Sequence, residues 1–504
     1  MRTKKAAFNT LSAAVSEIVS IICGLILPRL ILSAFGSSYN GVTSSISQFL
    51  SAVILLRAGI GGVTRAALYK PLAENDIAGI SGIVNATARF MRRVALIFIC
   101  ALGIFAIIFP FVVKAEFDWW FTSSLVLIIG SSTFVDNYFG ITYNMLLMAD
   151  QRQYVNTLLQ ILTTILNTIV AAILITNGAG VHLVKLGSAL VLFVRPLFVY
   201  FYVKKKYRIN KSIAPDNSAI SQRWDAFAQQ VAAFINNNTD VMVLTIFCDI
   251  KEVSVYSVYT LVTSGLYKVE NTLCNGIEAA FGNMMAKGEE ENLQRSFRLF
   301  EFIVFATSAF LFTCGGNLIV PFVTVYTNGV NDVSYARPLF GVLACLNQFL
   351  FCVRLPYHML ADAAGHFKQT RNGAIFESVM NIVVSVALVI KFGLIGVTIG
   401  TFCAMLFRTM QYAIYSSKNI LHRPIWIVLQ RLCIAVLEAV LITLICQMIL
   451  VGSMSDYGTW FLYAIEVGAV AVVVIALFSF LFCRSDLRLL LIKVKSIVHK
   501  RKTA

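Results

Sequence analysis

Apolar segments of about 20 residues or more recur along almost the whole chain, and they restrict its fold more than any other feature. A helix of this length crosses the hydrocarbon core of a bilayer, which is about 30 Å thick. The sequence is 58% hydrophobic and 13% charged, and a soluble protein of 504 residues could not bury that much apolar surface. Fourteen candidate spans are recognised, at residues 8–33, 40–63, 94–113, 121–142, 156–176, 183–203, 227–248, 254–280, 299–325, 336–358, 374–391, 393–416, 427–451 and 460–483.

Basic residues are distributed unevenly among the loops between these spans. With the N-terminus inside, 29 of the 41 lysine and arginine residues fall in inner segments, and only Lys114, Lys251, Arg337 and Lys391 fall in outer ones. This excess follows the positive-inside rule. It predicts an even number of helices with both termini in the cytoplasm, and it explains the net charge of +16 without a nucleic-acid partner.

An internal repeat runs through the chain at a nearly constant offset. Residues 143–146 (YNML) recur as residues 357–360 (YHML), an offset of 214. Further matches at an offset of 213 are Gly180 with Gly393, Gly187 with Gly400, and Arg195 with Arg408. Each copy covers six predicted helices, and because six is even the copies have the same orientation in the membrane.

The predicted fold is therefore an all-α membrane protein with about 14 transmembrane helices. Two parallel six-helix repeats form two bundles around a central cavity, and two further helices follow at the C-terminus. The predicted parts are an N-terminal bundle (1–210), a C-terminal bundle (211–424), two extra helices (425–483) and a basic cytoplasmic tail (484–504).

The sequence contains no catalytic signature. Nucleotide-binding glycine motifs, zinc-protease motifs and an ATPase domain are absent, and the longest predicted outer loop, about 326–335, is too short for a catalytic domain. The cysteines lie mostly in apolar spans without C-x-x-C spacing, so we expect packing residues rather than a metal site. The interpretation is a protein that is not an enzyme and needs no cofactor.

Ionisable residues within the spans are the candidate functional residues, because charge in a membrane is costly and usually functional. Lys268 lies near the middle of its span, and Arg57 matches it in the first repeat at an offset of 211. These two cations are predicted to face one another across the central cavity. Arg29 ends a polar face of the first helix, and Arg354 either lines the cavity or reaches the headgroups.

Other charged and polar residues of the spans have a simpler interpretation or a secondary role. Arg195, Arg408 and Arg431 lie within two to three turns of a cytoplasmic end, where long side chains reach the headgroups. Asn236 and Asn237 belong to a polar stripe that either lines the cavity or bonds neighbouring helices. The acids within the spans include Glu17, Asp136, Asp240, Glu270, Glu278, Glu377 and Glu438.

Taken together, these features resemble the polysaccharide flippase family, the exporters of lipid-linked oligosaccharides in the MOP (MATE-like) superfamily. The resemblance rests on the arrangement of six, six and two helices and on four segments. These segments are residues 32–41 (LSAFGSSYNG), 147–152 (LMADQR), 240–249 (DVMVLTIFCD) and 255–259 (VYSVY).

The resemblance implies a flippase in the bacterial cytoplasmic membrane that turns a polyprenyl-pyrophosphate-linked oligosaccharide from the inner to the outer leaflet for surface polysaccharide. Arg29, Arg57, Lys268 and Arg354 would bind the pyrophosphate, and Asn236 and Asn237 the sugars. A gradient of H+ or Na+ would drive transport, with Glu17 and Asp240 as coupling candidates. Expected partners are membrane lipid, a polysaccharide polymerase and glycosyltransferases.

Four alternatives remain open at this point. The chain could be a peptidoglycan lipid-precursor flippase, a MATE-type multidrug exporter, a membrane-embedded polymerase or transferase, or a scaffold that transports nothing. The pair of basic residues, Arg57 and Lys268, and the two extra helices favour an anionic lipid over a drug cation. They do not separate an oligosaccharide carrier from a peptidoglycan precursor.

The predicted topology can be tested by cysteine-accessibility labelling. We expect cysteines placed near Gly36, Ala179 and Met454 to react with an impermeant reagent from outside, and cysteines at Lys205 and Lys495 to react only from inside. Labelling of position 495 from outside would contradict an even number of helices.

Overall fold

The regular structure of this protein is helical throughout its described ranges. The computed structural model describes residues 2–52, 60–113, 117–216, 227–274, 277–449 and 456–502. Ten helices in these ranges are long and apolar enough to cross a membrane, so the chain is an all-α multi-pass membrane protein. The total of fourteen spans stays a prediction, since the second predicted span includes residues 53–59, outside the described ranges.

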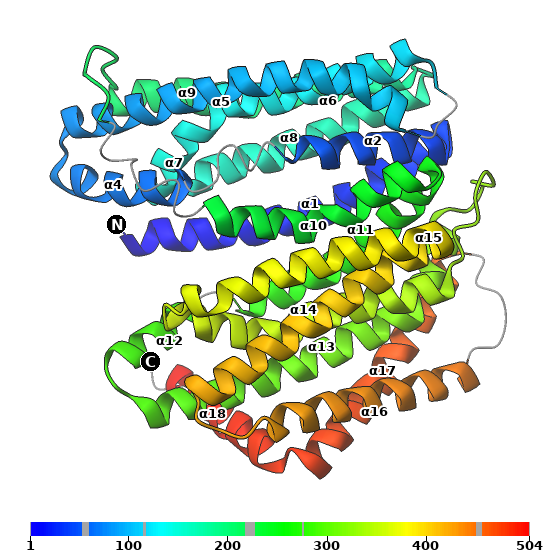
Figure 1. Ribbon diagram of the computed structural model, residues 1–504. Coiled ribbons are helices and arrows are strands. Elements are labelled where there is room, and N and C mark those ends of the chain that lie inside the picture. The colour runs from blue at the N-terminus through cyan, green and yellow to red at the C-terminus, as the bar shows by residue number, and fades with distance from the viewer. Residues whose placement is uncertain are drawn as a thin grey trace. The chain divides into compact units, whose positions relative to one another are not determined.

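Contacts divide the chain into two compact units, Met1–Ser257 and Val258–Ala504. The first unit contains α1 (Arg2–Phe35), α2 (Ser37–Leu50), α4 (Ile60–Glu74), α5 (Ile77–Val112), α6 (Trp119–Val135), the π-helix η1 (Asp136–Gly140), α7 (Ile141–Ala149), α8 (Gln153–Thr176), α9 (Val181–Tyr207), α10 (Phe227–Phe247) and the start of α11 (Ile250–Cys274). Helix α1 packs along α8, and α6 packs between α5 and α9 (Figure 1). The predicted boundaries of the sequence repeat stay predictions.

The second unit is built around one long helix, α13. It contains the rest of α11, α12 (Ile277–Ala286), α13 (Glu290–Tyr326), α14 (Pro338–Ala363), α15 (Phe367–Asn419), α16 (Trp426–Ile449), α17 (Tyr457–Phe482) and α18 (Arg484–Lys502). Helix α13 packs against α14, α16, α17 and α18 (Figure 1). The two helices that follow the predicted repeats are therefore packed on α13.

Helix α15 is a hairpin of two helical segments joined at a single residue. Gly393 has a non-helical backbone with φ 54° and ψ −130°, a region that favours glycine. The segments run back along each other, because Asn381 Nδ2 donates to Thr401 Oγ1 at 3.1 Å and Ser385 Oγ to the Val397 carbonyl at 3.2 Å. The hairpin corresponds to the predicted spans 374–391 and 393–416.

Glycine allows the helices of each hairpin to approach closely. A Cβ on Gly400 would lie 2.6 Å from the backbone nitrogen of Ser385, closer than real Cβ contacts. At the matching position of the first repeat, a Cβ on Gly187 would lie 2.8 Å from Leu174 Cδ1. Both glycines therefore lie where a neighbouring helical segment leaves little room for a side chain, as expected of small residues between membrane helices.

We expect Gly400→Ala to destabilise the protein, because the new methyl group must force the two segments of α15 apart. The expected loss in unfolding free energy is about 1–3 kcal/mol, the usual cost of overpacking. Gly316→Ala in α13 is the control, since a Cβ there meets nothing within 4 Å. It should be neutral or slightly stabilising, because glycine is a poor helix former. Thermal unfolding in detergent measures both, and equal midpoints would contradict the hairpin contact.

Candidate functional site

The residues predicted to line the cavity are only partly within the described structure. Lys268 is half-buried on α11, and Arg29 is half-buried on α1. Arg57 lies outside the described residues. Asn236 and Asn237 are in α10, but their side chains also lie outside the description. The grouping of these residues around one cavity therefore stays a prediction.

Arg354 is in a buried ionic group rather than exposed to a cavity. Its Nη1 contacts Glu377 Oε1 at 2.8 Å, and Arg408 Nε contacts the other oxygen, Oε2, at 3.3 Å. The side chains of Arg354, Glu377 and Arg408 are 11%, 4% and 6% exposed. Glu377 therefore bridges two arginines on α14 and on the second segment of α15.

Arg408 is held in place by several further contacts. It donates to the Thr370 carbonyl at 2.9 Å and to Tyr412 Oη at 2.9 Å. Its guanidinium also lies over the Tyr412 ring, 4.2 Å from the centroid. The expectation that this arginine reaches the headgroups is wrong, because partners inside the protein satisfy it.

In the first unit, the described polar residues of α10 and α11 bond neighbouring helices. Asp240 is buried and accepts a hydrogen bond of 3.0 Å from Tyr256 Oη. Asn238 Oδ1 accepts one of 2.7 Å from Ser51 Oγ, just after α2. These contacts fit the interpretation of the polar stripe as helix–helix hydrogen bonding. Glu17, the other coupling candidate, is exposed on α1.

The glycine-containing segment after α1 allows this close packing. A Cβ on Gly41 would collide with the carbonyl oxygen of Ile250 at the start of α11. One residue earlier, Asn40 Nδ2 donates to Ser254 Oγ at 2.8 Å and to Ser257 Oγ at 3.1 Å. The segment that carried part of the family resemblance thus joins α2 to α11.

Arg195 also has an acidic partner, at an irregular turn. Asp136 begins the π-helix, and Arg195 Nη2 lies 3.5 Å from its Oδ1. A Cβ on Gly140 at the end of this turn would lie 2.9 Å from Pro196 Cβ, so the turn packs directly on α9. π-Helical turns are rare and frequently occur at functional sites.

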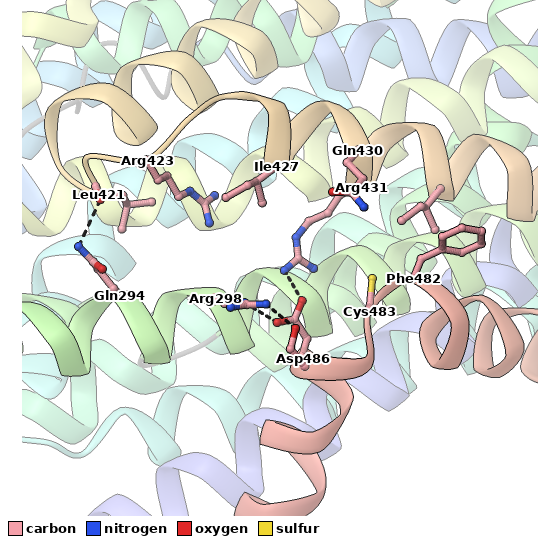
Figure 2. A pocket seen from close by; sticks show the side chains of 12 residues that line it. Gln294, Arg298, Leu421, Arg423, Ile427, Gln430, Arg431, Phe482, Cys483 and Asp486 are labelled. Atoms are coloured by element: carbon pink, nitrogen blue, oxygen red, sulfur yellow. Dashed lines mark hydrogen bonds and ion pairs between the residues drawn. The ribbon is translucent and has the colours of Figure 1, made fainter.

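A group of paired charges lies on α13, α16 and α18, and part of it is seen in Figure 2. Glu301 is 0% exposed, accepts a 2.5 Å hydrogen bond from Tyr357 Oη, and pairs with Arg423 and Arg431. We call Glu301, Tyr357, Arg423 and Arg431 the Glu301 cluster. Burial lowers the pKa of Arg423, but its bonds to Glu301 outweigh burial and hold that pKa above its ordinary value.

Asp486 connects this cluster to the C-terminal helix. It lies in the first turn of α18 and accepts bonds from Arg431 Nη2 at 2.7 Å and from Arg298 Nε at 2.5 Å, the convergence seen in Figure 2. A cavity of about 320 Å³ is lined by these side chains together with Gln294 and Gln430. The arginines here are paired with the carboxylates of Glu301 and Asp486, so the arrangement fastens α18 to the bundle.

Sequence reasoning missed this group. Arg431 was expected to reach the headgroups, but it is only 7% exposed and pairs with two acids, so that expectation is wrong. Glu301 lies two residues inside a predicted span and Asp486 just beyond the last one. The available signal was the position of these acids at the same predicted membrane face as Arg423 and Arg431.

Glu301→Gln should be strongly destabilising, because it leaves the guanidinium of Arg423 without a carboxylate and removes one of the two carboxylates that Arg431 contacts. Breaking a buried ion pair on one side typically costs about 3–5 kcal/mol. Arg298→Gln is the control: its side chain is 48% exposed, and such pairs contribute about 1 kcal/mol or less. The unfolding midpoints of the two purified variants test this prediction. A similar loss of stability in both would contradict the central role of Glu301.

Comparisons with known proteins agree with the fold described above. No protein-family model matches the chain, and no curated protein matches it in sequence. A structure described as the lipid II flippase MurJ in an inward closed conformation matches with a TM-score of 0.70 at 15% identity, over 94% of this chain and 98% of that one.

Two structures of multidrug resistance MATE family transporters of the MOP superfamily match less extensively. The inward-facing one has a TM-score of 0.62 at 16% identity, over 79% of this chain and 95% of that one. The outward-facing one has a TM-score of 0.50 at 17% identity, over 80% of this chain and 95% of that one. The chain therefore has the fold that these flippase and transporter structures share, a MurJ/MATE-like fold.

Proposed function

We propose that this protein is a flippase that moves a polyprenyl-pyrophosphate-linked oligosaccharide from the cytoplasmic to the outer leaflet, for surface polysaccharide. Transport follows alternating access and is driven by a gradient of H+ or Na+. The observation that carries the proposal is the match to a lipid II flippase over 94% of this chain, against 79% for the inward-facing multidrug transporter. The difference is close to the share of the chain contributed by α16, α17 and α18.

The chemistry of the substrate fits the residues predicted to bind it. A polyprenyl tail can stay in the bilayer, while pyrophosphate and sugars need a polar route across about 30 Å of hydrocarbon. Lys268 and Arg57 supply charge-assisted hydrogen bonds to pyrophosphate, and Arg29 extends the same basic route. Arg354 contributes less, because it is already paired with Glu377, which it shares with Arg408. Asn236 and Asn237 suit sugar hydroxyl groups.

A peptidoglycan lipid precursor is the second candidate substrate, because the most extensive match described above is to a lipid II flippase. Both substrates carry a pyrophosphate on a polyprenyl chain, so the basic residues serve either. A MATE-type drug exporter fits less well, since a basic pair repels a cationic drug. A polymerase or transferase lacks support from the fold, and such enzymes enter the proposal only as partners.

Lys268→Ala and Arg57→Ala should each reduce flipping of a fluorescent polyprenyl-pyrophosphate oligosaccharide in proteoliposomes. Each charge-assisted contact is worth about 1.5–3 kcal/mol, so the expected loss is roughly 10- to 150-fold. Lys268→Arg should retain more activity than Lys268→Gln, because charge matters more than shape at a single contact.

Lys391→Ala, at the predicted outer turn of α15, is the matched control and should leave flux unchanged. Unchanged flux in both cavity variants would remove Lys268 and Arg57 from the binding site. Competition by unlabelled peptidoglycan precursor identifies the substrate, because only a precursor flippase should lose oligosaccharide flux when that lipid is added.

A further inference from the structure

Glu270 on α11 is a buried acid that the proposed route does not use. Its side chain is 0% exposed. Cys274, one turn further along α11, and Val304 on the neighbouring helix α13 are fully buried too. The predicted span 254–280 places it within the hydrocarbon, about ten residues or 15 Å from the cytoplasmic end of that span. An acid at such a depth is a functional candidate by default.

No cation compensates Glu270 within the described part of the chain. Lys268 is two residues earlier on α11, and positions i and i+2 of a helix point to different sides. The thiols of Cys274 on α11 and Cys352 on α14 are the nearby titratable groups. Arg354 on α14 is engaged by Glu377. A carboxylate without a cation is strongly disfavoured at zero exposure, so burial favours the neutral acid.

The hydrogen bonds of Thr307 on α13 point the same way. Thr307 Oγ1 lies 2.9 Å from Glu270 Oε1 and 2.8 Å from the carbonyl oxygen of Ile303. A hydroxyl has one proton to donate, and a carbonyl can only accept. If Thr307 donates to Ile303, then Glu270 must donate to Thr307, which requires a protonated carboxyl. A carboxylate would instead compete with the carbonyl for one proton.

The second carboxyl oxygen of Glu270 also has few hydrogen-bond donors around it. Oε2 is buried without a hydrogen-bond partner, and so is the hydroxyl oxygen of the adjacent Ser308. A carboxylate is an acceptor at both oxygens and at this depth needs several donors to stay charged. In the described part of the chain the donors close to this carboxyl are the hydroxyls of Thr307 and the adjacent Ser308, and the Thr307 hydroxyl is shared with the Ile303 carbonyl.

We propose that Glu270, with Thr307 and Ser308, forms a proton-binding site between α11 and α13 that couples transport to a proton gradient. The inference rests on the proposed transport function and names H+ as the driving ion. In the present conformation Glu270 holds the proton. When water reaches the site in another conformation, the proton leaves to water and the carboxylate is hydrated.

The location on α11 connects this site with substrate binding. Lys268, the predicted pyrophosphate ligand, is half-buried on the same helix, less than one turn away. Loss of the proton creates a charge that the contact with α13 cannot satisfy, so that contact must loosen. Since Lys268 moves with the same helical turn, proton release and the position of the substrate cation change together.

Carbodiimide labelling tests the proton site without any substrate. Dicyclohexylcarbodiimide reacts with protonated carboxyl groups, and mass spectrometry of the purified full-length protein locates the adduct. We expect the label at Glu270. Above the titration midpoint of this carboxyl, the labelling rate should fall about tenfold for each pH unit, because the protonated fraction falls by the same factor. Absence of label at every pH, in protein shown to be folded by its unfolding midpoint, would overturn the site.

Proton-driven flux tests the coupling. Glu270→Gln keeps the size of the neutral acid but cannot release a proton, so flux should lose its response to an imposed pH gradient while exchange without a gradient persists. Glu438→Gln, which removes another buried acid on α16, is the matched control and should keep the response. A gradient response in Glu270→Gln equal to that of the unmodified protein would overturn the proposal. If no lipid-linked sugar moves at all, the labelling result still stands, so failure of the proposed function is distinguished from failure of the site.

Discussion

A polar group inside a bilayer finds no water, so it must be satisfied by the protein. This constraint explains why the described structure is helical and why many of its buried arginines are paired with acids. Arg195 lies against Asp136, Arg354 and Arg408 share Glu377, and Arg431 pairs with Glu301 and Asp486. The same requirement turns the hydroxyl and amide groups of α2, α10 and α11 toward one another.

Much of the fold follows from the sequence, because the period and length of apolar segments report directly on membrane helices. The hairpin of α15 was predicted as two closely spaced spans, and Gly393 is where they join. The conformation at Gly393 was not predicted, since a glycine in an apolar run does not indicate whether the chain turns there or continues. Gly187 and Gly400, which the predicted repeat pairs, both lie where a Cβ would be crowded by a neighbouring segment.

The candidate site was less predictable, because sequence gives the depth of a charge but not the direction of its side chain. Arg408 and Arg431 were placed close enough to the cytoplasm to reach headgroups, yet acids on neighbouring helices hold them inside. Those acids are distant in sequence: Glu301 and Arg431 are joined only by the packing of α13 against α16. Lys268 and Glu270 illustrate the same limit: they are only two residues apart on α11, yet Lys268 is half-buried and Glu270 is fully buried.

The π-helix at residues 136–140 has a geometric consequence for the helix that contains it. One extra residue in a turn rotates everything beyond it by about 100° relative to a regular α-helix. If the extra residue moved along the helix by one turn, the side chains between its old and its new position would rotate by the same angle, and the helix would stay coiled. In the second unit, α14, which the predicted repeat matches to this helix, instead contains Pro356, which removes one backbone hydrogen bond at a fixed position. The first unit can therefore rotate part of this helix about its axis by moving the extra residue. The described helices of the second unit contain no π-helical turn through which α14 could rotate in this way.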